Sequence, residues 1–147
     1  MAFDVDQLLR LWSDPIPDGP AGEEAFRAVY TDPVTINGSS FTVADLVTRA
    51  RAVQGTFEQP ERTILDHIEQ RDKVIVAFRL AGRQVGALPT ALGALPPTGR
   101  RLDIRVIDIL TLTDGRISNI WMVADELGAL VAADAVAFAP EVSPARV

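Results

Sequence analysis

The sequence predicts an α+β domain in which a strongly curved antiparallel or mixed sheet packs against about three N-terminal helices. Two observations support this fold class. Apolar residues recur with helical spacing as far as Gly55, and they alternate with a period of two from Glu61 onward. Helices followed by long strands and a short closing helix are typical of α+β proteins. Helices packed on the concave side of such a sheet would enclose an apolar pocket.

Two helices are expected at the N-terminus. Residues 3–13 carry an apolar face at i, i+3, i+4 and i+7, formed by Val5, Leu8, Leu9 and Trp12. The Pro-rich segment that follows ends this helix. Residues 21–30 form the second helix, which Pro33 breaks soon afterwards.

A short strand and a third helix follow. Residues 34–36 read as the strand, and Asn37 begins a tight turn. Thr42 and Asp45 resemble a capping box, with aspartate where glutamate is usual. We therefore expect the third helix to begin after Thr42 and to end at Gly55.

The remaining chain is predicted to form the sheet. The expected strands are residues 63–69, 73–80, 102–112 and 117–123, and the closing helix is 126–136. Asp114 and Gly115 between two alternating runs are a strong hairpin signal. We expect a single domain over residues 1–138 and a flexible tail over 139–147.

Composition excludes several classes of function. The net charge is −6 and the sequence pI is about 4.7, which disfavours nucleic acid and anionic membranes as partners. The chain has no cysteine, so disulfides, thiol nucleophiles and thiolate metal ligands are excluded. No His/Asp/Glu spacing suggests a metal site, and no glycine-rich phosphate loop is present. We expect a cytoplasmic protein without a cofactor, since no signal segment or membrane-spanning run is visible.

Three short segments resemble a known family. They are GRQVG at 82–86, PPTGRR at 96–101 and TDGRI at 113–117. Their order and spacing are similar to those of the SnoaL-like polyketide cyclases, within the nuclear-transport-factor-2-like superfamily. The resemblance implies a cone-shaped α+β barrel around an apolar pocket, and a homodimer formed through the sheet face. It also implies cofactor-free acid–base chemistry, such as intramolecular aldol ring closure, on a small apolar or aromatic polyketide-derived ester.

The sequence departs from this family where the family's chemistry is expected. The position that is often histidine in the GRQVG segment is Gln84 here. A second histidine of the family falls at Asp108, and the acid–base aspartate of the last strand falls at Met122. A thioether cannot accept a proton from carbon at neutral pH, so Met122 cannot perform that aspartate's role.

Asp108 is the main catalytic candidate. It alternates with Leu102, Ile104, Val106, Leu110 and Leu112, so it is predicted to lie on the apolar face of its strand. A carboxylate there is costly unless it is paired or its pKa is raised. We interpret Asp108 as a general acid or base; the alternative is a buried aspartate paired with hydroxyl groups or with an arginine at a dimer interface.

Asp125 and His67 are weaker candidates for proton transfer. Asp125 matches the aspartate that closes the last strand of the family, but its position before a helix also suits an N-cap. His67 is the only histidine, and histidine is the side chain that most commonly shuttles protons near neutral pH. It lacks partners for a catalytic triad, so a surface or edge-strand position is the alternative.

Several residues are candidates for substrate binding. A flat apolar ligand would contact Trp12, Tyr30, Phe57, Ile120, Trp121 and Met122. Hydrogen bonds to a carbonyl would come from Tyr30, Asn37 and Gln84. The alternatives are plain core packing for the aromatic residues and a turn role for Asn37.

Three functions remain open. The first is a cyclase-like or isomerase-like enzyme using Asp108. The second is a non-catalytic ligand-binding or accessory module of the same fold. The third is another reaction, such as epoxide hydrolysis or oxygenation; for epoxide hydrolysis Arg79 would need a neighbouring carboxylate, but Ala81 occupies that position.

Overall fold

The computed structural model describes residues 2–140 of the chain. Its helices are α1 (Val5–Ser13), α2 (Pro20–Arg27), α3 (Val43–Thr56) and α4 (Glu126–Ala132). Its long strands are β1 (Tyr30–Ile36), β3 (Phe57–Gln70), β4 (Lys73–Gln84), β7 (Arg101–Thr113) and β8 (Arg116–Ala124). Its short strands are β2 (Ser39–Phe41), β5 (Leu88–Thr90) and β6 (Gly93–Leu95).

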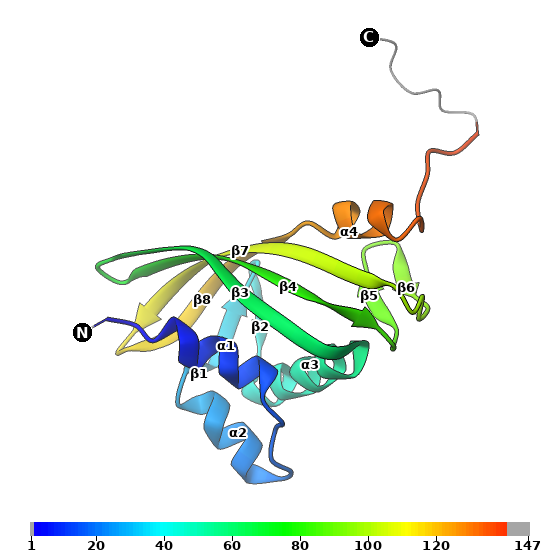
Figure 1. The fold of residues 1–147 in the computed structure, drawn as a ribbon. Helices are drawn as coiled ribbons and strands as arrows, with labels where there is room; N and C mark the ends of the chain where they lie inside the picture. The colour runs from blue at the N-terminus through cyan, green and yellow to red at the C-terminus, as the bar shows by residue number, and fades with distance from the viewer. Residues whose placement is uncertain (1, 141–147) are drawn as a thin grey trace.

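Six strands form one curved, open sheet in the order β2-β1-β8-β7-β4-β3. Strands β1 and β8 run parallel, and every other neighbouring pair in this sheet is antiparallel. Helices α1, α2 and α3 lie against the concave side, which we call the inner face; the other side is the outer face (Figure 1). This arrangement confirms the predicted α+β class, and β2 and β3 remain edge strands.

The starts of α1 and α3 follow from local capping. The Asp4 carboxylate accepts a 2.8 Å hydrogen bond from the backbone N–H of Gln7 at the start of α1. At α3, the Thr42 hydroxyl accepts from Asp45 N–H at 3.1 Å, and the Asp45 carboxylate accepts from Thr42 N–H at 2.9 Å. The predicted capping box is therefore confirmed.

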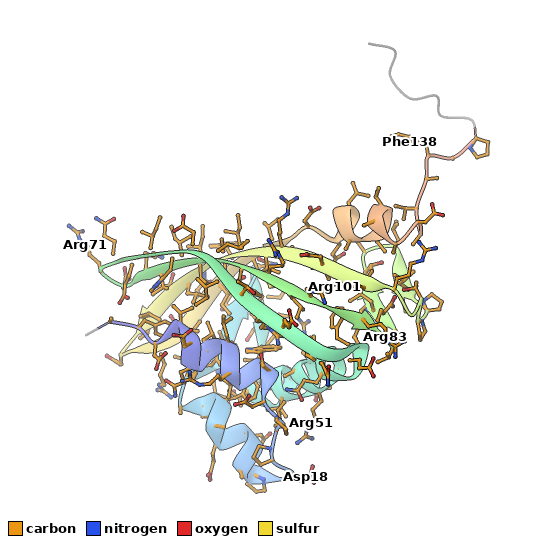
Figure 2. The ribbon with its side chains drawn as sticks, viewed as in Figure 1. Asp18, Arg51, Arg71, Arg83, Arg101 and Phe138 are labelled. Atoms are coloured by element: carbon orange, nitrogen blue, oxygen red, sulfur yellow. The ribbon has the colours of Figure 1, made fainter. Side chains whose placement is uncertain are left out.

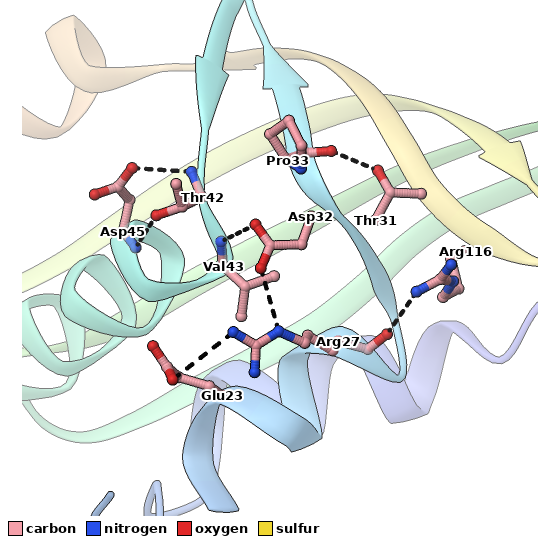
Figure 3. A network of polar contacts seen from close by, with 9 residues as sticks. All are labelled: Glu23, Arg27, Thr31, Asp32, Pro33, Thr42, Val43, Asp45 and Arg116. Carbon is pink, nitrogen blue, oxygen red and sulfur yellow. Dashed lines mark hydrogen bonds and ion pairs between the residues drawn. The ribbon is translucent and has the colours of Figure 1, made fainter. Parts of the chain in front are cut away.

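A polar network ties α2, β1 and α3 together (Figure 3). The Asp32 carboxylate accepts a hydrogen bond of 3.1 Å from Val43 N–H and one of 3.2 Å from Arg27 Nε. Arg27 also lies 3.8 Å from a Glu23 carboxylate oxygen within α2. These contacts fix the N-terminus of α3 beside β1, and so position the helical layer against the sheet.

The main core lies between the helices and the inner face. Val74, Val76 and Leu110 of the sheet are almost fully buried there, as are Phe26 of α2 and Leu46 of α3. Burial of such apolar side chains contributes about 1.5–3 kcal/mol each to folding. The helices are thus held chiefly by the alternating inner-face residues that the sequence pattern identifies.

Three aromatic residues from different elements meet in this core. The rings of Trp12 and Phe26 pack edge to face with centroids 5.7 Å apart. Those of Phe26 and Tyr30 stack at 6.1 Å. This packing brings α1, α2 and the start of β1 to one point under the sheet.

Some element boundaries differ from the prediction. The second helix ends at Arg27, and Tyr30 instead begins β1, where it pairs with Ile117 of β8. The closing helix ends at Ala132 rather than at residue 136. Most of the predicted flexible tail, residues 141–147, lies outside the described residues.

Strands β2, β5 and β6 were not predicted. Each has only three residues, too few to show a period of two. Strands β5 and β6 form a hairpin beside α4, where the Glu126 carboxylate accepts a 3.4 Å hydrogen bond from Ala91 N–H. The long β3–β4 hairpin extends from Arg71 at its tip to Arg83 near the other end of β4 (Figure 2).

Within residues 2–140, no helix is long and apolar enough to cross a membrane.

Candidate functional site

Asp108 lies on the inner face of the sheet. Its neighbours across the strands are Val76 on β4 and Met122 on β8. Its Oδ1 atom is buried and has no hydrogen-bond partner among residues 2–140. The predicted position on the apolar face is therefore confirmed, and the expected alternative of a paired carboxylate is not seen within this part of the chain.

Burial alone changes the acidity of this carboxyl group. Removal from water raises the pKa of Asp108 to about 7, because the charged form loses hydration without gaining a partner. At neutral pH the group therefore populates both its protonated and its ionised form. A general acid or base works best when its pKa lies near the working pH.

Tyr30 and Arg62 lie near Asp108, under the inner face of the sheet. The Tyr30 hydroxyl oxygen accepts a 2.8 Å hydrogen bond from Trp12 Nε1. Burial raises the pKa of Tyr30, and the Asp108 charge adds to this rise. The Trp12 hydrogen bond and the Arg62 guanidinium oppose it. The phenol therefore keeps its proton, and both charged side chains affect its pKa.

His67 lies on the same face as Asp108, on the edge strand β3. Register places His67, Val76, Asp108 and Met122 in one row across four strands. Two strand spacings, roughly 10 Å, separate the backbones of His67 and Asp108. The imidazole Nε2 lies 3.9 Å from a Glu69 carboxylate oxygen. His67 therefore shares the site's face but does not contact Asp108 directly.

Asn37 and Ile120 support strand β8 at the Met122 end of this row. The Asn37 side chain accepts a 2.8 Å hydrogen bond from Met122 N–H and donates one of 3.2 Å to Met122 C=O. Asn37 has a φ of 50°, as a turn residue often does. Its amide clamps the turn onto β8, while Ile120 is buried in the core.

Gln84 is a fully buried clamp for the loop after β4. Its Nε2 donates to the carbonyls of Gly86, Leu95 and Pro96 at 3.1, 3.1 and 3.2 Å. Its Oε1 accepts from the N–H and the hydroxyl of Thr98 at 3.2 and 2.8 Å. The bonds connect the GRQVG and PPTGRR segments, which gives a physical reason for their co-occurrence.

The remaining candidates lie away from Asp108. Trp121 pairs with Ile109 on the outer face and is 54% exposed. Phe57 packs in a second core cluster with Leu80 and Leu102. The sheet therefore separates Trp121 from the inner-face candidates.

Asp125 caps α4. Its carboxylate accepts a 2.9 Å hydrogen bond from Gly128 N–H and another of 2.9 Å from Arg105 Nη2. The Arg105 hydrogen bond, followed by that of Gly128, lowers the pKa of Asp125. The capping alternative for this residue is confirmed.

Arg62 is a site residue that sequence reasoning missed. It lies on β3 opposite Leu80, which places it on the inner face. The predicted strand began one residue later, at Thr63, so Arg62 fell outside the alternating run. Its alternation with Ile64 within a longer strand was the available signal.

The protein surface has two hollows of note. One of about 530 Å³ lies between α1 and β3 and includes Arg62; the other, of about 360 Å³, lies near Phe41 and Arg49. Asp108 lines neither of these two, so an apolar pocket around it stays a prediction.

Residues 2–140 form neither the epoxide-hydrolase arrangement nor a metal site. Arg79 lies on β4 with its guanidinium Nε 3.4 Å from an Asp103 carboxylate oxygen, and register places both on the outer face. That position does not suit the epoxide-hydrolase arrangement. Residues 2–140 contain no group of three or more His, Asp or Glu side chains placed to hold a metal ion.

Fold and site together define a nuclear-transport-factor-2-like α+β protein with a buried carboxyl group on the inner face of its sheet. The family model described as SnoaL-like polyketide cyclase matches residues 14–132. The chain belongs to this family. A comparison with curated protein sequences gives no match.

Solved structures share the fold at low sequence identity. TsrD from Streptomyces laurentii is 23% identical with a TM-score of 0.71, covering 90% of this chain and 96% of its own. AclR from Streptomyces galilaeus, a candidate hydroxylase, is 17% identical with a TM-score of 0.66, covering 93% and 88%. A SnoaL-like polyketide cyclase from Agrobacterium tumefaciens str. C58 is 13% identical with a TM-score of 0.69, covering 87% and 91%.

Proposed function

We propose that this protein is a small-molecule enzyme that performs cofactor-free acid–base chemistry, of the cyclisation or isomerisation type, on an apolar polyketide-like substrate. The observation that carries the proposal is the inner-face carboxyl of Asp108, whose buried Oδ1 has no hydrogen-bond partner within residues 2–140. A fold seldom retains such a costly group without a use for it. Membership of the SnoaL-like family supports the substrate class.

The proposed reaction begins with the ionised form of Asp108. The carboxylate takes a proton from the carbon between two carbonyl groups, which leaves an enolate on the substrate and a carboxylic acid on Asp108. The enolate carbon then attacks a second carbonyl carbon of the same molecule, forming a C–C bond and an alkoxide. The carboxylic acid returns the proton to this alkoxide, so the enzyme ends in its starting state.

Solvent exchange at an acidic carbon tests the first step. In deuterium oxide, NMR would follow exchange of the α-proton of methyl 3-oxo-3-phenylpropanoate, an apolar β-keto ester. We expect the protein to accelerate exchange and Asp108→Asn to lose about two or more orders of magnitude of that acceleration. Asp103→Asn is the matched control, because Asp103 lies on the outer face of the same strand.

Two outcomes would reject this assignment. Equal exchange rates in Asp108→Asn and the unaltered protein would remove the acid–base role. An equal loss in Asp103→Asn would show that the effect is not specific to the inner face. Circular dichroism of both variants would confirm that each remains folded.

The alternative is a non-catalytic ligand-binding or accessory module of the same fold. Met122 at the family's aspartate position favours it, as does the commitment of the Gln84 amide to the main chain. Under this alternative, Asp108→Asn would alter affinity for apolar ligands while no substrate is turned over. Calorimetry on a panel of aromatic β-keto esters, run beside the exchange assay, separates the two functions.

We also propose that the protein forms a homodimer through the outer face of the sheet. Two adjacent rows of apolar side chains cross that face: Ile68, Ile75, Ile109 and Trp121, and then Ala77, Ile107 and Val123. Soluble monomers rarely expose so continuous an apolar surface. A second copy of this chain is the partner that fits this surface best, because a twofold axis lets the two apolar rows pack against the same rows of the other copy.

Light scattering tests the dimer. We expect a dimer for the unaltered chain and a monomer for Trp121→Glu, since Trp121 is at the end of one row. Leu92→Glu in the β5–β6 hairpin is the control, because Leu92 is 77% exposed and lies outside the rows. A monomeric unaltered protein, or a dimeric Trp121→Glu, would reject this interface.

A further inference from the structure

The Arg62 guanidinium is partly buried without a carboxylate partner. Its Nη1 donates hydrogen bonds of 2.9 Å to Ser13 Oγ and 3.5 Å to the Trp12 carbonyl, which are both neutral acceptors. No carboxylate oxygen of residues 2–140 lies within 4.0 Å of it. Burial lowers the pKa of Arg62, so the charged form is held at a cost.

Arginines elsewhere in the described chain show the contrast. Several exposed guanidinium groups are paired with carboxylates, as in Arg79 with Asp103 and Arg83 with Glu58. Water already solvates those surface charges, so their pairing adds little. Arg62 has the greater need for an anion, yet its remaining donors, Nε and Nη2, have no partner among residues 2–140.

Arg62 also opens onto the larger surface hollow. This groove of about 530 Å³ between α1 and β3 is lined by Leu9, Arg10, Ser13, Pro60, Arg62 and Ile64, and also by Asp6 and Thr63. Its volume falls within the usual range for small-molecule sites, about 300–1,000 Å³. Two positive charges and the one negative charge of Asp6 give the groove a net positive charge on a chain of net charge −6.

We infer that the groove between α1 and β3 binds a small apolar carboxylate, whose two oxygens accept hydrogen bonds from the free edge of Arg62. A planar guanidinium fork matches a carboxylate in this bidentate way. Leu9, Pro60 and Ile64 supply apolar walls for the rest of the ligand. This site is distinct from the carboxyl group of Asp108, and the inference does not depend on the proposed proton transfer.

A matched pair of probes tests the role of charge. Calorimetry would compare 3-phenylpropanoate with its neutral amide, 3-phenylpropanamide, on the full chain. We expect the carboxylate to bind about tenfold or more tightly than the amide, as charge-assisted hydrogen bonds imply. Equal affinities, or no binding of the carboxylate, would overturn the inference.

Variants then locate the site. Arg62→Gln should weaken carboxylate binding about tenfold or more, while Arg62→Lys should give an intermediate affinity because it keeps the charge without the fork. Arg79→Gln is the control, because Arg79 lies outside the groove on the outer face of the sheet, with its Nε 3.4 Å from an Asp103 carboxylate oxygen. In NMR, the Trp12 amide and indole N–H signals should shift on binding to the unaltered protein.

Two results would assign binding elsewhere. Unchanged affinity in Arg62→Gln would exclude Arg62 as the anchor, and an equal loss in Arg79→Gln would indicate general charge attraction. Should Arg62→Gln not fold, the comparison of Arg62→Lys with Arg79→Gln decides the same question. None of these measurements uses turnover, so failure of the proposed enzyme function would leave this test intact.

Discussion

Asp108 and Met122 occupy directly opposite positions on β7 and β8, with both side chains on the inner face of the sheet. The family resemblance places its acid–base aspartate at Met122, whereas the carboxyl group of this chain lies one strand away. Opposite residues of an antiparallel pair have Cβ atoms about 4.5–5.5 Å apart. The two positions therefore reach much the same space under the sheet.

Restoring a carboxylate at Met122 should couple it to Asp108. In Met122→Asp, two carboxyl groups at this spacing cannot both ionise freely, so one apparent pKa should rise above about 7 and the other should fall below it. Carbon-13 NMR titration of the carboxyl signals measures both. Met122→Asn is the uncharged control, and an Asp108 midpoint identical in the two variants would show that the side chains do not interact.

Asp108 should make the protein less stable as pH rises. Its folded-state pKa of about 7 exceeds its ordinary value of 3.8, so the folded state binds the proton more tightly than the unfolded state. The stability gained is complete below about pH 4 and is lost as pH rises through about 7, up to about 4 kcal/mol in all. Chemical unfolding at a series of pH values measures this loss.

The variant Asp108→Asn removes this dependence. The free energy of unfolding of Asp108→Asn, minus that of the unaltered protein, should grow as pH rises from 4 to 8. Tyr30, Arg62 and His67 near the same face are present in both proteins, so their effects on stability largely cancel. A constant difference across this range would show that the pKa of Asp108 is not raised.

The sequence predicted those parts of the fold that have a strong local cause. Alternation placed Asp108 on the inner face, and the Thr42–Asp45 capping box marked the start of α3. The role of Gln84 was not predictable, because its partners at Leu95 and Pro96 come from a loop without periodicity. Arg62 was missed since bulges in β3 interrupt the pairing near it, and a strand edge is the weakest part of a periodic signal.

Gln84 should be essential for the loop that follows β4. Gln84→Ala removes hydrogen bonds to three carbonyl groups, at a cost of about 3 kcal/mol in the free energy of unfolding. Urea unfolding measures this cost, and limited proteolysis should show faster cleavage within residues 85–100.

The neighbouring Arg83 provides the control. Its Nε lies 2.7 Å from a Glu58 carboxylate oxygen on the surface, so Arg83→Ala should cost no more than about 1 kcal/mol. If Gln84→Ala were as mild as Arg83→Ala, the clamp would not explain why GRQVG and PPTGRR occur together.

Asp125 should stabilise α4 and should not contribute to proton transfer. In Asp125→Ala the helix loses its cap and the Arg105 hydrogen bond, so amide hydrogens near Gly128 should exchange faster while those of β7 are unchanged. Because its folded pKa is lowered, the cap's contribution is present above about pH 4 and is lost as pH falls through the folded pKa. Hydrogen exchange followed by NMR at pH 3 and pH 6 measures both effects.

The α-proton exchange of the β-keto ester should continue at the unaltered rate in Asp125→Ala and fall in Asp108→Asn. A loss as large in Asp125→Ala would return Asp125 to the catalytic candidates.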